Sequence, residues 1–322
     1  MASIMKRGSK WRVSICVKGS RRSKTFRTKA EAATWALQAE SETGLLSGKQ
    51  TFGDLLKRYA KEVSPKKRGH YWESRRIELI QNDVIASVRL SDLGRSHIAE
   101  WRDRRLQKVS AGTVLREWNL LSHACTVAVR EWQWLKTNPM STVSRPPEPK
   151  PRTRRPSEDE IDRLILASGY DYDHRPETIA ARCGACFLFA IETAMRAGEI
   201  CGLEWEHVHD NYVHLPMTKN GSSRDVPLTK EAQRIIQQMK GTDDSRVFGI
   251  SSSQLESNFR LARKRAAIEG LTFHDSRREA LTRLSKKLDV LELARVSGHR
   301  DLKILLQVYY APTVGDLAEK LD

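Results

Sequence analysis

The first fifty residues change their hydrophobic period in a way that predicts a small sheet followed by one helix. Apolar side chains first alternate with polar ones, as in a strand with one buried face, at Trp11, Val13, Ile15 and Val17. A turn at residues 18–20 and a second strand at about 23–27 should follow. Thr28 and Glu31 then form a capping-box pattern. The apolar side of the helix after it consists of Ala32, Trp35, Ala36 and Ala39.

From residue 51 the apolar positions recur every three or four residues, which is typical of helices. The helical stretches are 51–63, 72–85, 96–109 and 110–135. They predict a domain of four or five helices. Four tryptophans at helical positions are expected in its core rather than as platforms for stacked bases: Trp101, Trp118, Trp132 and Trp134.

A proline-rich segment at 145–156, RPPEPKPRTRRP, separates this domain from the rest, because five prolines cannot be held in a helix. The expected domains are therefore 1–50, 51–150 and 151–322. The last one begins with a helix capped by Ser157 and Glu160, and a second, apolar helix ends near Arg196. Two short strands, within 211–217 and 222–228, flank a turn at 219–221. The predicted fold class is mainly α with small β elements (α+β).

Charge changes this picture, because the excess of basic residues lies entirely in the first half of the chain. The 322 residues carry a formal net charge of +16. Residues 1–50 contain eleven Lys and Arg against three Asp and Glu, residues 51–153 twenty against eleven, and residues 154–322 twenty-five against twenty-six. Two successive basic segments predict contact with nucleic-acid phosphates, although the first could also be a structural subdomain with a basic surface. The expected DNA contacts are Arg21, Arg22, Lys24, Arg27, Lys66, Lys67, Arg68, Arg104 and Arg105.

Composition argues against several other classes of protein. No run of about 18 apolar residues predicts a membrane span, and the N-terminus lacks the apolar middle of a secretory signal, so we expect a cytoplasmic, nucleoid-associated protein. Five cysteines are too few for a disulfide framework. Cys183 and Cys186 form a C-x-x-C inside an apolar helix. Core packing is the main interpretation, with a redox pair or half of a zinc site as alternatives.

Five fragments of the last domain contain side chains suited to phosphoryl transfer: TAMRAGEICGLEW, MTKNGSSRDVPL, FHDSRREALTRL, SGHRD and QVYYAP. A phosphodiester under attack gathers negative charge, and the guanidinium groups of Arg196 and Arg277 can each donate to two of its oxygens. His274 lies three residues before Arg277, so both lie on one helical face. His274 and His299 can donate hydrogen bonds or transfer protons near neutral pH. Each fragment alone is a weak signal, because R-x-x-E on a helix is usually a salt bridge and H-x-x-R is as often an ordinary surface pair. All five in this order are strong evidence.

Taken together and in this order, the five fragments resemble the catalytic sequence of the tyrosine recombinase (phage integrase) family over residues 157–322. The earlier segments resemble that family's arm-binding and core-binding domains more weakly. The resemblance implies that Arg196 is the first catalytic arginine, supported structurally by Glu199. It also implies that Lys219, on the hairpin turn, is the general acid that protonates the leaving 5′ oxygen.

The same resemblance implies that His274 and Arg277 are the H-x-x-R pair and that His299 occupies the later G-H position. The nucleophilic tyrosine is commonly nine residues after that histidine, where this chain has a valine. We assign Tyr309, because YYAPTVGDLAEKL then aligns with the end of the family sequence, and keep Tyr310 as the alternative. Two further departures are Ala194, in place of a glycine, and Ser276, in place of a leucine.

The apolar stripe of the last residues, Val314, Leu317, Ala318 and Leu321, belongs to a tail that docks on a neighbouring protomer in this family; a helix folded back on its own domain is the alternative. The implied function is a site-specific DNA recombinase (integrase) that acts through a 3′-phosphotyrosyl intermediate and integrates or excises a phage or mobile element.

The expected partners are double-stranded DNA at core and arm-type sites, a homotetramer on synapsed DNA, and accessory DNA-bending or directionality proteins. No metal or other cofactor is expected, because the phosphotyrosine bond conserves the energy of the broken phosphodiester. The alternatives are a type IB topoisomerase, a catalytically inactive DNA-binding regulator, and a cysteine hydrolase that uses Cys183 or Cys201.

Overall fold

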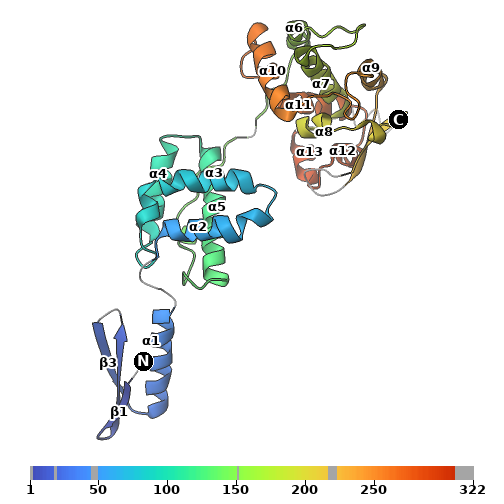
Figure 1. The fold of residues 1–322 in the computed structure, drawn as a ribbon. Coiled ribbons are helices and arrows are strands. Elements are labelled where there is room, and N and C mark those ends of the chain that lie inside the picture. Colours follow the sequence, from blue (N-terminus) through green and yellow to red (C-terminus); the bar gives the residue numbers. More distant parts are fainter. Residues whose placement is uncertain (1–2, 18–19, 45–49, 151, 217–222, 309–322) are drawn as a thin grey trace. The chain divides into compact units, whose positions relative to one another are not determined.

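The computed structural model describes residues 3–17, 20–44, 50–150, 152–216 and 223–308 (Figure 1). The chain divides into two compact units, Met1–Pro151 and Arg152–Asp322. The division lies inside the proline-rich segment 145–156, where the sequence analysis places a domain boundary.

The N-terminal part of the first unit is a three-stranded antiparallel sheet with one helix beside it (Figure 1). Its elements are β1 (Ser3–Arg7), β2 (Lys10–Val17), β3 (Ser20–Phe26) and α1 (Lys29–Gly44). Val13, Ala32 and Ala36 form its buried core. The capping box at the start of α1 is confirmed, since Thr28 Oγ1 accepts from the Glu31 amide at 3.2 Å and Glu31 accepts from the Thr28 amide at 3.4 Å.

Strand β1 was not predicted from the sequence, and β3 begins three residues earlier than predicted. Strand β1 has no alternation to detect, because only Ile4 among its five residues is even partly buried. It is recruited by pairing with β2, where Ile4 lies opposite Val13. The tight turn expected at 18–20 falls partly on residues outside those described.

The rest of the first unit contains four α-helices between residues 50 and 143, as predicted: α2 (Phe52–Glu62), α3 (His70–Gln81), α4 (Arg95–Leu106) and α5 (Ala111–Arg130). Three 3-10 helices connect or follow them: η1 (Ser64–Lys66), η2 (Val84–Ser87) and η3 (Pro139–Thr142). Helix α2 starts at a capping box in which Thr51 and Asp54 bond each other's backbone amides. Its buried face, with Phe52 and Leu56, packs into one apolar core.

The four tryptophans belong to this core, which confirms the structural interpretation. Trp101 and Trp118 are buried with ring centroids 6.3 Å apart, and Trp132 and Trp134 pack against the core from its edge. The Arg58 guanidinium lies 4.5 and 4.8 Å from the rings of Trp132 and Trp134. Helix α5 ends at Arg130, earlier than predicted, and the chain has turned by residue 133, which has a φ of +55°.

Over its described residues the second unit is mainly helical with one two-stranded sheet, as predicted (Figure 1). Its helices are α6 (Glu158–Ser168), α7 (Ile179–Thr193), α8 (Ala197–Cys201), η4 (Trp205–His207), α9 (Lys230–Gln238), α10 (Ser252–Arg265), α11 (His274–Leu284), α12 (Val290–Ser297) and α13 (Leu302–Val308). The strands β4 (Tyr212–Leu215) and β5 (Arg224–Pro227) pair antiparallel. The predicted Ser157–Glu160 capping box at α6 is confirmed.

Helix α7 lies at the centre of this unit and contacts α6, α9, α10 and α11. Phe187 of α7, Phe259 of α10 and Phe273 pack together, with centroids 5.4 to 6.0 Å apart. Because Phe273 directly precedes α11, this aromatic cluster fixes where α11 begins. Cys183 and Cys186 are fully buried in the same core, which agrees with core packing. Among the described helices, none combines the length and the apolar character that a bilayer crossing requires.

Candidate active site

Arg196 stands at the sharp turn between α7 and α8. Helix α7 ends at Thr193, Ala194 adopts the left-handed conformation with φ +54°, and Arg196 is the N-cap of α8. The Glu199 carboxylate accepts from the Arg196 amide at 2.9 Å and from Arg196 Nη1 at 2.8 Å. A side chain with a Cβ in this conformation costs about 1–2 kcal/mol, which explains why the family places a glycine where this chain has Ala194.

Arg277 joins the segment of Arg196 to that of His299. It lies in the first turn of α11 and is 3% exposed. Its Nη1 donates to the Ala194 carbonyl, and its Nη2 donates to the Ser297 carbonyl at 2.7 Å. These carbonyls stand two residues before Arg196 and two residues before His299, so one guanidinium brings the two segments together.

Ser276, beside it, is a buried polar residue at a position where the family has a leucine. Its hydroxyl donates to the Phe273 carbonyl at 2.6 Å. Because a buried hydroxyl is costly only when it lacks a partner, this bond allows the departure from the family pattern.

His299 follows the left-handed end of α12. Gly298 has φ +70°, and a Cβ there would lie 3.2 Å from Arg224 Cδ, so both the backbone and the neighbouring side chain favour glycine. The half-buried His299 ring is oriented by Ser297, whose Oγ lies 2.7 Å from His299 Nδ1.

Arg224, which the sequence analysis did not single out, holds this cluster together. Its side chain is 7% exposed, and it donates two hydrogen bonds to Glu199, at 2.7 and 3.0 Å. Its Nε donates to the Val296 carbonyl at 3.1 Å. Arg224 thereby connects β5 with the carboxylate that orients Arg196 and with the end of α12. Its position in SSRDVPL, five residues after Lys219, was the available signal.

Electrostatics favour an anion at this place. Burial alone would raise the pKa of Glu199, but hydrogen bonds from Arg224 and Arg196 outweigh it and lower the pKa to about 2. Burial, followed by the charges of Arg277, Arg196 and Arg224, lowers the pKa of His299 to about 4. Burial and Arg277 also lower the pKa of His274. Near neutral pH the cluster therefore contains three guanidinium groups, one carboxylate and two neutral imidazoles, an arrangement suited to a phosphate.

The structure thus brings Arg196, Glu199, Arg277 and His299 together, and His274 is an exposed residue three positions before Arg277 on α11. Lys219, Tyr309 and Tyr310 lie outside the described residues. So does the apolar stripe of the C-terminal tail.

The predicted DNA contacts in and directly after β3 and η1 have mixed surroundings. Lys24, Arg27, Lys66 and Arg68 are exposed. Arg21 and Arg22 belong to β3, opposite Cys16 and Ile15, but their side chains are outside those described. Lys67 donates to the hydroxyl of Tyr59 and, at 2.9 Å, to Glu73.

The prediction for Arg105 is wrong. Its guanidinium donates to Glu117 at 2.7 and 2.9 Å, and both side chains are buried between α4 and α5. Arg105 therefore stabilises the helical domain from inside and does not present its charge to DNA. Arg104, one residue earlier, is partly exposed and donates to Asp83 at 2.7 Å.

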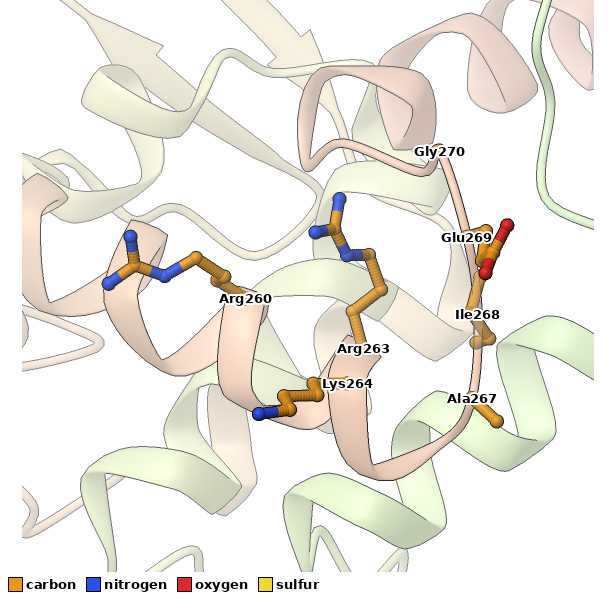
Figure 2. Close-up of a pocket in the computed structure, with 7 residues that line it drawn as sticks. All are labelled: Arg260, Arg263, Lys264, Ala267, Ile268, Glu269 and Gly270. Carbon is orange, nitrogen blue, oxygen red and sulfur yellow. The ribbon is translucent and has the colours of Figure 1, made fainter.

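A basic surface pocket lies at the end of α10, with a volume of about 640 Å³. Figure 2 shows Arg260, Arg263 and Lys264 extending from the helix, with the loop 267–270 beside them. Arg263 also donates to the Leu271 carbonyl at 2.6 Å, whereas Arg260 and Lys264 are exposed. This surface offers donors to an anion outside the cluster around Arg277.

Two further groups of side chains in the described part of the second unit are of types that can support chemistry: the cysteines and a candidate metal site. Burial raises the pKa of the Cys183 thiol to about 12 and also raises that of Cys201, which argues against a cysteine nucleophile. In the described part of the chain, Glu204, Glu206 and His207 have ligand atoms within 4.8 Å of one another. They lie in or next to the single turn of η4, and Glu206 is exposed.

Comparison with known proteins decides the family. Residues 154–315 match the model of the phage integrase family. A protein of Haemophilus influenzae described as an integrase/recombinase is 44% identical, covering 99% of this chain and 89% of the relative. The chain belongs to the phage integrase family. It is also 36% identical to a shufflon-specific DNA recombinase of Escherichia coli, over 85% of this chain and 72% of the relative.

The fold of this integrase agrees with that assignment. A lambda integrase tetramer bound to a Holliday junction superposes with a TM-score of 0.69 at 18% identity, covering 95% of this chain and 94% of that one. This integrase is a tyrosine recombinase, a site-specific enzyme that cleaves and rejoins DNA strands. DNA is its substrate, and neither the topoisomerase nor the inactive regulator is favoured.

Proposed function

We propose that Arg196, His274, Arg277 and His299 bind one scissile phosphate and that cleavage there forms a 3′-phosphotyrosyl intermediate. The observation that carries this proposal is the Arg277 guanidinium, which donates to the carbonyls of Ala194 and Ser297. These two hydrogen bonds support the proposal that three fragments, far apart in the sequence, form one site.

In this mechanism Arg196 and Arg277 stabilise the charge that develops on the non-bridging oxygens. Because Ser297 Oγ lies within hydrogen-bond distance of His299 Nδ1 and the low pKa keeps the ring neutral, Nε2 carries the proton when the serine donates. His299 then donates from Nε2 to the phosphate without adding charge. His274 is a second neutral donor or proton carrier.

The nucleophile in this proposal is the Tyr309 hydroxyl, with Tyr310 as the alternative. Its oxygen attacks phosphorus as its proton passes to the neutral imidazole of His274, and the displaced 5′ oxygen of the DNA takes a proton from Lys219. Rejoining reverses these steps with a 5′ hydroxyl from the partner strand. The phosphotyrosine bond retains the energy of the original phosphodiester, so neither step consumes a nucleotide.

We propose a division of labour among three domains, with residues 1–50 on arm-type DNA, 51–150 on the core site and 151–322 at the cleavage site. Exposed Lys24, Arg27, Lys66 and Arg68 support the first two assignments. The basic pocket of α10 supports a further backbone contact by the catalytic domain. The proposed working assembly is a homotetramer on synapsed DNA, with accessory DNA-bending or directionality proteins as further partners.

The proposal is tested by covalent trapping in cells. The protein and its Tyr309→Phe, Tyr310→Phe and Arg277→Ala variants are expressed, protein-bound DNA is isolated, and the attached ends are sequenced. We expect adducts at one discrete DNA site that disappear in Tyr309→Phe and Arg277→Ala but persist in Tyr310→Phe.

A matched control is Arg295→Ala, which removes an exposed arginine of α12 and should leave the adducts unchanged. Loss in Tyr310→Phe alone would exchange the two tyrosines. Adducts of normal abundance in Arg277→Ala would overturn the proposed site.

A further inference from the structure

Asp275 is a buried carboxylate between two proposed catalytic side chains. It stands in the first turn of α11, directly after His274 and two residues before Arg277, and its side chain is 2% exposed. Its oxygens accept from the Thr272 amide at 2.7 Å and from Thr272 Oγ1 at 2.9 Å. Asp275 therefore fixes the turn from which the catalytic helix starts.

The charged partner of Asp275 comes from the other end of the catalytic unit. Arg152, the first residue of that unit, donates to Asp275 from Nε at 2.8 Å and from Nη2 at 2.7 Å. Arg152 also donates to the Gly270 carbonyl, on the loop that leads into α11. Arg152, next to the segment that links the two units, thus bonds both the loop before α11 and the first turn of α11.

A second arginine repeats this contact one turn further along α11. Arg155 donates to Glu279 at 2.8 Å, and Glu279 is also buried. Glu279 has another cationic partner, because Arg283 donates to it at 2.9 Å. Among the hydrogen bonds given above, Asp275 has no second cationic donor, because its other donors belong to the neutral Thr272. Arg152 is therefore the contact on which the start of α11 depends.

The charge of Asp275 supports this dependence. Burial would raise its pKa, but the hydrogen bonds from Arg152 and Thr272 outweigh burial and lower it. Without Arg152 the buried carboxylate would lack the cation that donates hydrogen bonds to it. Either the first turn of α11 would then shift until Asp275 reached water, or Asp275 would take up a proton. Either change moves the backbone that carries His274 and Arg277.

We infer that Arg152 is a positioning residue for DNA cleavage, which acts through Asp275 on the catalytic helix. This inference rests on the proposed roles of His274 and Arg277. The residue at which the chain enters the catalytic unit therefore helps to hold the active site in place.

The test uses the full-length protein and a duplex with the DNA sequence recovered from the covalent adducts. Binding affinity and the first-order rate of adduct formation at saturating protein are measured for Arg152→Ala, Arg152→Lys and Arg175→Ala. Arg175 is the control, because it belongs to the same unit but pairs with the exposed Glu177.

We expect Arg152→Ala to slow adduct formation at least tenfold while the affinity stays within twofold. Arg175→Ala should change neither quantity by more than twofold. Arg152→Lys should recover part of the rate, since an ammonium retains the charge but not the two parallel bonds. An Arg152→Ala protein that forms adducts at the normal rate overturns the inference.

A double-mutant cycle separates positioning from loss of folding. Asp275→Asn removes the buried charge, so the Arg152→Ala/Asp275→Asn protein does not carry an unpaired carboxylate. If Arg152 acts through Asp275, the double variant forms adducts within twofold of the rate of Asp275→Asn alone. If the two substitutions instead reduced the rate independently, so that their effects multiplied in the double variant, Arg152 would not act through Asp275. Arg277→Ala in the same assay distinguishes the two proposals: normal adduct formation there would refute the catalytic assignment itself.

Discussion

Replacement of Arg224 by methionine should destabilise the catalytic unit in a pH-dependent way. Arg224 supplies two of the hydrogen bonds that hold Glu199 ionised in a buried position. A carboxyl whose pKa falls from 4.5 to about 2 on folding contributes about 3 kcal/mol of stability at neutral pH. Removal of one partner of a buried pair costs about 3–5 kcal/mol, and Arg196 remains as a second partner. We therefore expect a loss of roughly 2–3 kcal/mol at pH 7.

The pH dependence gives this prediction its sign. Because the pKa of Glu199 is lowered by folding, its contribution is complete above about pH 4.5 and disappears as the pH falls toward 2. Arg224→Met should consequently lose much less stability than the unaltered protein over that acid range. The two proteins should differ most at neutral pH.

Pulsed hydrogen exchange across a urea series measures this effect, because peptides from 152–322 report the catalytic unit separately from the first unit. Arg175→Met is the control, since Arg175 pairs with the exposed Glu177 and should cost at most about 1 kcal/mol. Equal slopes of stability against pH for Arg224→Met and the unaltered protein would refute the reasoning.

Three further outcomes are expected. Gly298→Ala should destabilise the catalytic unit by about 1–2 kcal/mol and slow adduct formation, since it strains the backbone and displaces Arg224; thermal unfolding and trapping check this. Because the folded-state pKa of His299 is about 4, its burial costs stability as the pH falls below 6.5, and His299→Gln should reduce that loss in unfolding measured between pH 6.5 and 4. Arg105→Met should cost roughly 3 kcal/mol, because the buried Glu117 carboxylate would keep only the longer contact from Arg76, at 3.4 Å, while the salt dependence of DNA affinity should not change; unfolding and binding titrations check both.

Local patterns in the sequence predicted most of the elements, because their causes are local. In the capping boxes at Thr28 and Ser157 the two bonded residues are only three positions apart in the sequence. The helical period within 51–135 reflects the face that each helix buries in one core. Strand β1 was missed because pairing with β2, and not an apolar alternation of its own, makes it a strand.

The proposed active site was predictable only as far as the family pattern reaches. That pattern identified Arg196, Arg277 and His299, which the structure brings together. Arg224 was missed because its role depends on Glu199, 25 residues before it, and on Val296, 72 residues after it. Arg105 was misassigned for the same reason, since its partner Glu117 lies on the next helix.

The pair formed by Arg105 and Glu117 also changes how the basic character of the first unit should be counted. DNA binding gains free energy when each bound cation displaces a condensed counterion, and an internal guanidinium displaces none. The nineteen lysines and arginines of 51–150 therefore overstate the number of ions that this domain can release. The affinity of this domain for DNA should therefore fall with added salt according to the number of lysines and arginines that face outward. That fall should be less steep than the total number in the sequence suggests.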